Sequence, residues 1–140
     1  MSKFAIPQRF ESTLADDGVW FGVVDENENH WGDFKCRLMD QDSRSYKQAQ
    51  ERVHTRLQKL HRNKPVENEV LLREIFLDAV LVDWRKVPGA NGKDVPYSAQ
   101  DAREYFEAEG TKFALLNLMA YAQDVGNFNV ANKDDIAKNS

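Results

Sequence analysis

The chain has 140 residues, a length that favours one domain with a buried core. Hydrophobic residues make up 41% and charged residues 30% of it, which is the composition of a folded globular chain and excludes a disordered one. No apolar run approaches the roughly 18 residues of a membrane-spanning helix, and the single cysteine, Cys36, excludes an intramolecular disulfide. We therefore expect a cytosolic protein without a membrane partner.

The net charge of −4 is distributed unevenly along the sequence. Residues 44–64 hold seven Lys or Arg residues and one acid, Glu51, so this segment carries +6 and the rest of the chain −10. Such a separation is compatible with a nucleic-acid surface, an acidic protein partner or ion pairs within the chain. The sign of the charge alone does not show which of these three explanations holds.

A β-hairpin is predicted over residues 19–38, after a polar segment, 1–18, that we expect to be irregular. Two runs of alternating residues, 19–24 and 31–38, flank a polar turn, and β-branched and aromatic residues dominate them. A hairpin alone is marginal in water. We therefore expect it to lie on helices, or to pair with neighbouring copies through its exposed edge.

A basic amphipathic helix is predicted over residues 44–62. Asn63-Lys64-Pro65 ends it, because proline cannot continue the helical hydrogen bonds. The apolar stripe of this helix consists of residues at spacings of three and four: Tyr46, Ala49, Val53, Leu57 and Leu60.

A second helix is predicted over residues 66–83, and apolar residues cover most of its circumference. We therefore expect it to be the most buried element. Glycine-rich turn chemistry follows at 88–92.

Two further helices are predicted in the C-terminal third. The first, 99–108, begins at Ser98, which is expected to be its N-cap, with Asp101 three residues on. The second, 112–125, is capped by Thr111 in this prediction and is expected to be largely buried. Residues 1–128 then form a single α+β domain, predominantly α-helical, with an N-terminal β-hairpin followed by about four helices. Residues 129–140 are expected to form a polar, flexible tail.

No catalytic, metal or cofactor site is expected, so we predict a non-enzymatic protein. The histidines His30, His54 and His61 lack a neighbouring cysteine cluster and the HExxH spacing of a zinc site. Cys36 shares a strand face with Phe34 and Leu38, which predicts a buried thiol. No nucleophile-elbow, P-loop or dinucleotide motif occurs.

The candidate partner-binding residues come from the basic helix and the hairpin: Arg52, Arg56, Lys59, Trp20 and Trp31. Aromatic side chains serve both as core and as interface anchors, and the sequence leaves both roles open for these tryptophans. The basic helix also fits a small phage or bacterial regulator that binds nucleic acid through residues 44–62, and we keep this function as an alternative. Nucleic acid is the less favoured partner, because the chain is acidic overall and the helix has one aromatic residue, Tyr46, on its apolar stripe.

An ordered set of short motifs resembles the tail assembly chaperones of phages with long, non-contractile tails. At its centre are Val82-Asp83-Trp84-Arg85-Lys86-Val87, a loop with Asn91-Gly92-Lys93, and Val95-Pro96-Tyr97-Ser98 before a helix. The flanking parts are Gly18-Val19-Trp20-Phe21, Phe34-Lys35-Cys36, Asn127-Phe128 and Asp134-Asp135-Ile136-Ala137-Lys138-Asn139.

This resemblance implies a protein that binds the long, helical tape measure protein, keeps it soluble and is absent from the finished virion. It also implies recruitment of tail tube protein, through a longer frameshifted form, and a location in the cytoplasm of the bacterial host. Self-association is expected, because a multimer is needed to coat a long client. The matching positions Asp83, Trp84, Pro96, Tyr97, Ser98 and Phe128 are implied to define the fold. The Asp83-Trp84 pair is expected to connect helix 66–83 to the C-terminal helices.

Overall fold

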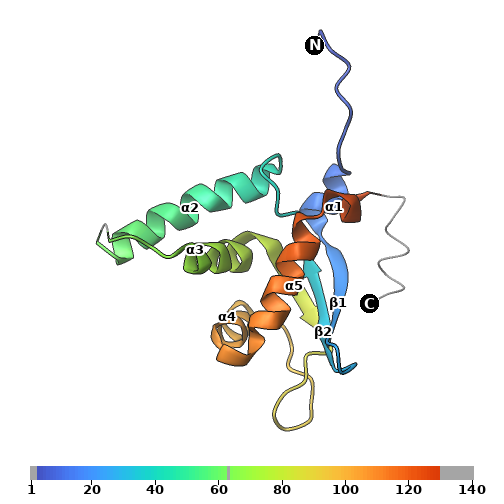
Figure 1. The fold of residues 1–140 in the computed structure, drawn as a ribbon, viewed down its shortest axis with the longest axis vertical. Coiled ribbons are helices and arrows are strands. Elements are labelled where there is room, and N and C mark those ends of the chain that lie inside the picture. Colours follow the sequence, from blue (N-terminus) through green and yellow to red (C-terminus); the bar gives the residue numbers. More distant parts are fainter. Residues whose placement is uncertain (1–2, 63, 130–140) are drawn as a thin grey trace.

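A computed structural model describes residues 3–62 and 64–129. In this part of the chain, helices pack against a three-stranded antiparallel sheet that lies at one side of the molecule (Figure 1). The α+β class, the helical majority and the N-terminal hairpin are confirmed. The elements in chain order are α1 (Ser12–Asp17), β1 (Val19–Val24), β2 (His30–Cys36), α2 (Arg44–Leu60), α3 (Asn68–Ile75), a π-helical turn η1 (Phe76–Val80), β3 (Leu81–Arg85), α4 (Ala99–Glu107), a 3₁₀ turn η2 (Glu109–Thr111), α5 (Lys112–Gln123) and a 3₁₀ turn η3 (Val125–Phe128).

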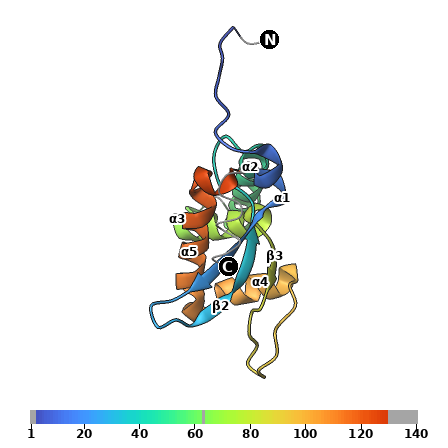
Figure 2. The same cartoon turned by 90° about the vertical axis from the view of Figure 1, so that its right-hand side faces the viewer.

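The strands run in the order β1-β2-β3, so the predicted hairpin supplies the edge and the centre of the sheet. The register places Phe21 opposite Phe34, and Phe34 opposite Trp84. Because side chains alternate between the faces of a strand, these three rings share one face. All three are buried, and α5 packs on β1 and β2 along the sheet (Figures 1 and 2).

The predicted helix over residues 66–83 is wrong beyond Val80. The α-helix ends at Ile75, a single π-helical turn follows, and Leu81 adopts extended backbone angles (φ −74°, ψ 123°). Residues 81–85 then pair with β2, so the Asp83-Trp84 pair lies in a strand rather than at a connection between helices. A short apolar run fits a buried helix and a buried strand equally well, and the hydrogen-bonding edge of β2 decides between them.

The polar segment before the hairpin was expected to be irregular, but residues 12–17 form α1. This helix is held at both ends by backbone hydrogen bonds from distant segments. Glu11 N–H donates to Phe128 O at 2.9 Å, and Leu38 N–H donates to Ala15 O at 3.2 Å. Ala15 is buried, so tertiary packing produces a helix that the local sequence does not announce.

The remaining helices end slightly earlier than predicted, at Leu60, Glu107 and Gln123. The expected stripe of α2 is buried except for its last member, because Leu60 lies at the helix end and is 70% exposed. The predicted tail falls almost wholly on residues 130–140, which lie outside the described residues.

Capping follows the prediction at α4 but not at α5. Ser98 Oγ accepts a hydrogen bond from Asp101 N–H at 3.0 Å. Thr111 instead donates its hydroxyl to the carbonyl oxygens of Tyr105 and Ala108, at 2.6 and 2.8 Å. It therefore satisfies the end of α4 rather than the start of α5.

Candidate functional site

Two arginines of the basic helix, Arg52 and Arg56, are engaged within the chain. Arg52 Nη2 lies 2.5 Å from Asp78 Oδ1, and Arg56 lies 3.5 Å from Glu74 and 3.7 Å from Asp78. Of the three explanations for the charge separation, internal pairing accounts for these two residues. The pairs fasten α2 against α3 and η1, the two-helix projection seen in Figure 1.

Glu74 extends this network to α4. It is 8% exposed and accepts hydrogen bonds from Arg103 Nη1 at 2.7 and 2.9 Å. A buried carboxylate held by two arginines is stable only while its partners stay in place, so Glu74 fixes the position of α4 relative to α2 and α3.

The other predicted partner-binding residues lie far apart in the fold. Lys59 is exposed near the end of α2, beside Leu60. Trp20 faces the side of the sheet opposite Phe21, where the Arg85 guanidinium lies 4.2 Å from its ring centroid. The structure therefore places Trp20 on the sheet, whereas Arg52, Arg56 and Lys59 follow one side of α2.

Trp31, unlike Trp20, packs against α5. Its ring centroid lies 5.5 Å from that of Phe113 on α5, and its Nε1–H donates to Asp25 at 3.1 Å. Trp31 is half-buried. It thus connects the hairpin to α5.

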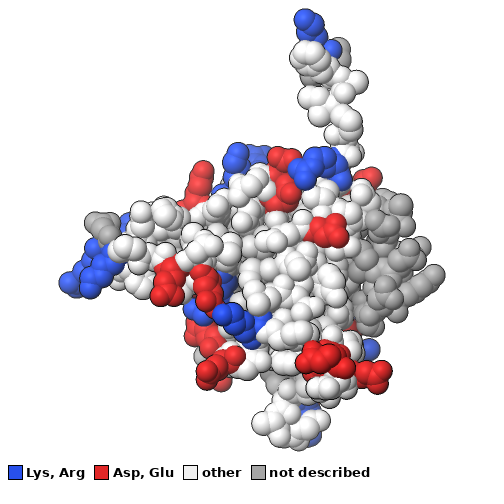
Figure 3. All heavy atoms as spheres, in the orientation of Figure 1, with Lys and Arg blue, Asp and Glu red and all other residues white. Residues whose placement is uncertain are grey.

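The outer side of α5 carries an uncharged surface. The helix has eleven successive residues without a charge, 113–123. Leu116 is 53% and Tyr121 38% exposed, and Ala120 between them is exposed as well. We call this surface the α5 face: Leu116, Ala120 and Tyr121, with the half-buried Phe113 and Asn117. Figure 3 shows a broad area without charged side chains over this helix.

A cluster of this kind is typical of a protein-binding surface. The centres of interfaces are depleted in charged residues and enriched in aromatic ones, and contiguous exposed apolar surface is uncommon on an isolated domain. Tyr121 is held in place by stacking on Phe21, with centroids 5.2 Å apart and an interplanar angle of 11°. The uncharged run is visible in the sequence, which predicts a largely buried helix but not which of its residues stay exposed.

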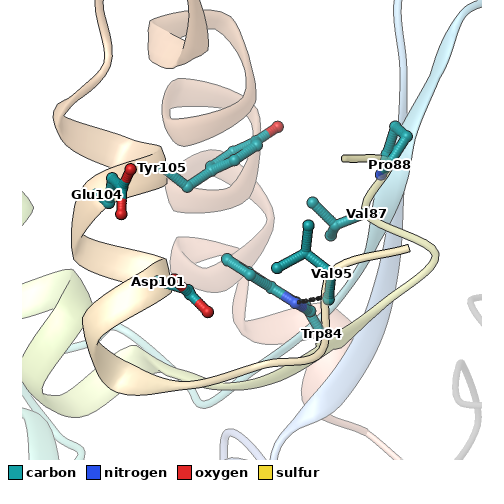
Figure 4. A pocket seen from close by; sticks show the side chains of 7 residues that line it. All are labelled: Trp84, Val87, Pro88, Val95, Asp101, Glu104 and Tyr105. Carbon is teal, nitrogen blue, oxygen red and sulfur yellow. Dashed lines mark hydrogen bonds between the residues drawn. The ribbon is translucent and has the colours of Figure 1, made fainter. Parts of the chain in front are cut away.

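A groove lies beside Trp84, between α4 and the loop 86–97 (Figure 4). Trp84 Nε1–H donates to Val95 O at 2.8 Å, which fastens the loop to the strand. The cavity measures about 200 Å³. Apolar side chains and two carboxylates line it: Trp84, Val87, Pro88, Val95, Tyr105, Asp101 and Glu104.

A second cavity of about 200 Å³ adjoins the first and shares Pro88 and Tyr105 with it. Trp31, His30, Asn29 and Asp25 complete its wall. We call the two cavities together the Trp84 groove. Burial raises the pKa of Tyr105, whose phenol lies between the cavities, to about 12.

Asp33 is a buried carboxylate that the sequence analysis missed. It is 0% exposed, and its Oδ2 lies 3.1 Å from Arg85 Nε and 3.9 Å from Lys86 Nζ. Its Oδ1 makes no hydrogen bond and lies 3.6 Å from His30 Nε2. Aspartate is unusual at the centre of a strand, and this is the feature of the sequence that indicates a special role for Asp33. We assign it a structural role, holding β2 to the end of β3 and to the residue that follows it.

Cys36 is fully buried, as predicted, and burial raises the pKa of its thiol. Across residues 3–62 and 64–129, no set of three His, Cys, Asp or Glu side chains is placed to hold a metal ion. The same residues contain no helix that is both long and apolar enough to span a membrane.

The family model described as YdaY prophage protein matches residues 40–139 of this chain. The match covers well over half of the 140 residues and runs from the start of α2 to beyond η3. No curated protein and no solved structure matches the chain. The chain is therefore of phage origin and belongs to the YdaY prophage protein family.

Proposed function

We propose that this protein is a phage tail assembly chaperone that binds the tape measure protein and keeps it soluble without catalysing a reaction. Its phage-derived family and the ordered motifs around Asp83-Trp84 and Pro96-Tyr97-Ser98 support this proposal. The observation that carries it is the α5 face, where Leu116 and Tyr121 are exposed within the uncharged run 113–123 of α5.

The chemistry of the α5 face suits a helical client. An amphipathic helix binds by laying its apolar side on a complementary apolar surface, and the uncharged run on α5 offers such a surface without desolvating an ion. A long client presents many such helices. Many copies of the chaperone, each making a modest contact, then cover the client. Their combined binding is strengthened by effective concentration, so no single tight pocket is needed.

The proposal extends to the partners that follow from this role. The protein works in the cytoplasm of the bacterial host, associates with itself along the client and leaves before the virion is complete. Tail tube protein joins through a longer, frameshifted form of the chain.

Co-expression with the tape measure protein of the same phage tests the proposal. Leu116→Lys places a charge on the α5 face, whereas Leu60→Lys changes a leucine that is 70% exposed on α2 and serves as the matched control. We expect soluble tape measure protein with the wild type and with Leu60→Lys, and its loss to the pellet with Leu116→Lys. Insoluble client with the wild-type chain would refute the function. Full solubility of the tape measure protein with Leu116→Lys would refute the assignment of the α5 face as the client-binding surface.

The nucleic-acid alternative is less favoured because Arg52 and Arg56 are ion-paired with Asp78 and Glu74. Neutralised arginines contribute little to counterion release on a phosphate backbone. We expect no binding of the purified chain to DNA or RNA at physiological salt. Binding that weakens steeply with salt and depends on Arg52 and Arg56 would instead favour the regulator.

A further inference from the structure

The N-terminal segment, residues 3–9, projects from the body of the molecule as an extended arm. Both views show it leaving one end of the long axis (Figures 1 and 2). Its root is fixed, since Arg9 forms ion pairs with Asp40 and Asp42, and Glu11 N–H bonds to Phe128 O. Pro7 favours an extended conformation for the residue before it.

The arm exposes two large apolar side chains, Phe4 at 71% and Ile6 at 77%. They stand two residues apart. The backbone bends at Phe4 in the free chain, and in an arm bound in extended form the two side chains would point to the same side, roughly 7 Å from each other. The Lys3 ammonium lies 6.0 Å from the centroid of the Phe4 ring. The arm thus presents an aromatic ring, a cation beside it and an aliphatic side chain in a row.

The Trp84 groove offers the complementary row. Its first cavity has an apolar floor at Trp84 and Val95 and carboxylates at Asp101 and Glu104. Its second cavity, which begins across Tyr105 and Pro88, is bordered by Trp31. Two adjoining cavities of similar volume offer a place for each of the two apolar side chains, and the carboxylates match the lysine in charge.

The arm and the groove of one molecule lie at opposite ends of it. The loop 86–97, which forms one wall of the groove, lies at the end of the long axis away from the arm in both views (Figures 1 and 2). A contact between an arm and a groove is therefore a contact between copies. Because it joins two different surfaces, it is a heterologous contact, which builds an open chain of copies unless the rotation between neighbours closes the chain into a ring.

We propose that the arm of one copy binds in the Trp84 groove of the next, with Phe4 in the cavity beside Trp84 and Ile6 in the cavity beside Trp31. Lys3 then faces Asp101 and Glu104. This contact specifies the self-association that the proposed function includes, but it does not involve the α5 face, which stays open to a client.

Sedimentation velocity of the purified full chain, without any client, tests this contact. We expect the average mass of the wild type to rise continuously with concentration, and both Phe4→Asp and Glu104→Lys to remain monomeric. Gln8→Asp on the arm and Glu109→Lys outside the groove are exposed controls that should associate like the wild type. Pairing Lys3→Glu with Glu104→Lys in one chain should restore association.

A mixture of the two defective variants gives the sharpest result. Phe4→Asp keeps a working groove and Glu104→Lys keeps a working arm, so together they should form a one-to-one complex that grows no further. A peptide of residues 3–9 should also shift the indole NMR signals of Trp84 and Trp31 and leave that of Trp20 unchanged. A wild type that stays monomeric at all concentrations would overturn the proposal, as would variants that associate normally. Client solubility in the absence of self-association would overturn this contact and leave client binding by the α5 face intact.

Discussion

The indole nitrogen of Trp84 lies 2.8 Å from the carbonyl oxygen of Val95, eleven residues further along the chain. The ring also meets Phe34, Tyr97 and Tyr105 at centroid distances of 6.1, 5.5 and 5.6 Å. One side chain thus ties β3, the following loop and α4 together. The contacts are made from a strand and not from a connection between helices.

Substitution of Trp84 separates the hydrogen bond from the packing. Trp84→Phe keeps an aromatic ring but leaves the Val95 carbonyl without its donor, and we expect a loss of about 1–3 kcal/mol in the free energy of unfolding. Trp84→Ala also empties part of the core and should cost about 3–5 kcal/mol. Urea denaturation measures both, and equal losses for the two variants would show that the hydrogen bond and ring packing are not separable here.

Gly32 is required where β2 crosses the end of β3. Its φ is +136°, and a Cβ at this position would lie 2.8 Å from Cγ2 of the buried Val87. Gly32→Ala should therefore destabilise the fold by about 1–3 kcal/mol. Gly110→Ala is the matched control, because a Cβ there meets nothing within 4 Å, and it should stay within about 0.5 kcal/mol of the wild type. A thermal shift as large for Gly110→Ala as for Gly32→Ala would contradict this explanation.

The basic helix divides into paired and unpaired cations. Arg52→Gln breaks the contact with Asp78 and should lower the free energy of unfolding by about 0.5–1 kcal/mol, less at high salt. Lys59→Gln changes an exposed side chain at the helix end and should have an effect below about 0.5 kcal/mol. Chemical denaturation at low and high salt compares the two. A larger loss in the free energy of unfolding for Lys59→Gln than for Arg52→Gln would show that the stabilising charge lies at the end of the helix instead.

Tyr105 should make stability fall at high pH. Burial raises the pKa of its phenol to about 12 in the folded chain, against an ordinary value of 10.0. Between these values the unfolded chain has lost the proton that the folded chain keeps, so the folded state loses stability as pH rises. Below pH 10 the contribution is fully present. In Tyr105→Phe the decline between pH 10 and 12 should be shallower than in the wild type, and an identical slope in both would contradict the assignment.

The sequence predicted the elements whose pattern is local. Alternation revealed β1 and β2, and Ser98 revealed the start of α4. It could not predict β3, because an apolar run becomes a strand only when a distant edge is free to pair with it, as β2 is with Leu81 and Trp84. Nor could it predict the Arg52–Asp78 contact across 26 residues, beyond naming internal pairing as one of three explanations.

The candidate surfaces were only partly accessible to prediction. Trp31 was chosen as a partner-binding residue and borders both α5 and the Trp84 groove. Leu116 and Tyr121 were missed because an uncharged helix normally indicates burial on all sides, whereas α5 packs against the sheet on one side. Which side of such a helix remains exposed depends on the number of layers in the fold, and local pattern does not encode that number.

Hydroxyl-radical footprinting of the chain, alone and in complex with the tape measure protein, tests the proposed client surface most directly. Leu116 and Tyr121 on the α5 face are exposed in the free chain, and so is Leu60 on α2, which serves as the internal control. We predict that the complex lowers the labelling of Leu116 and Tyr121 and leaves that of Leu60 unchanged. Unchanged labelling of Leu116 and Tyr121 in a verified complex would contradict the assignment of the α5 face as the client-binding surface.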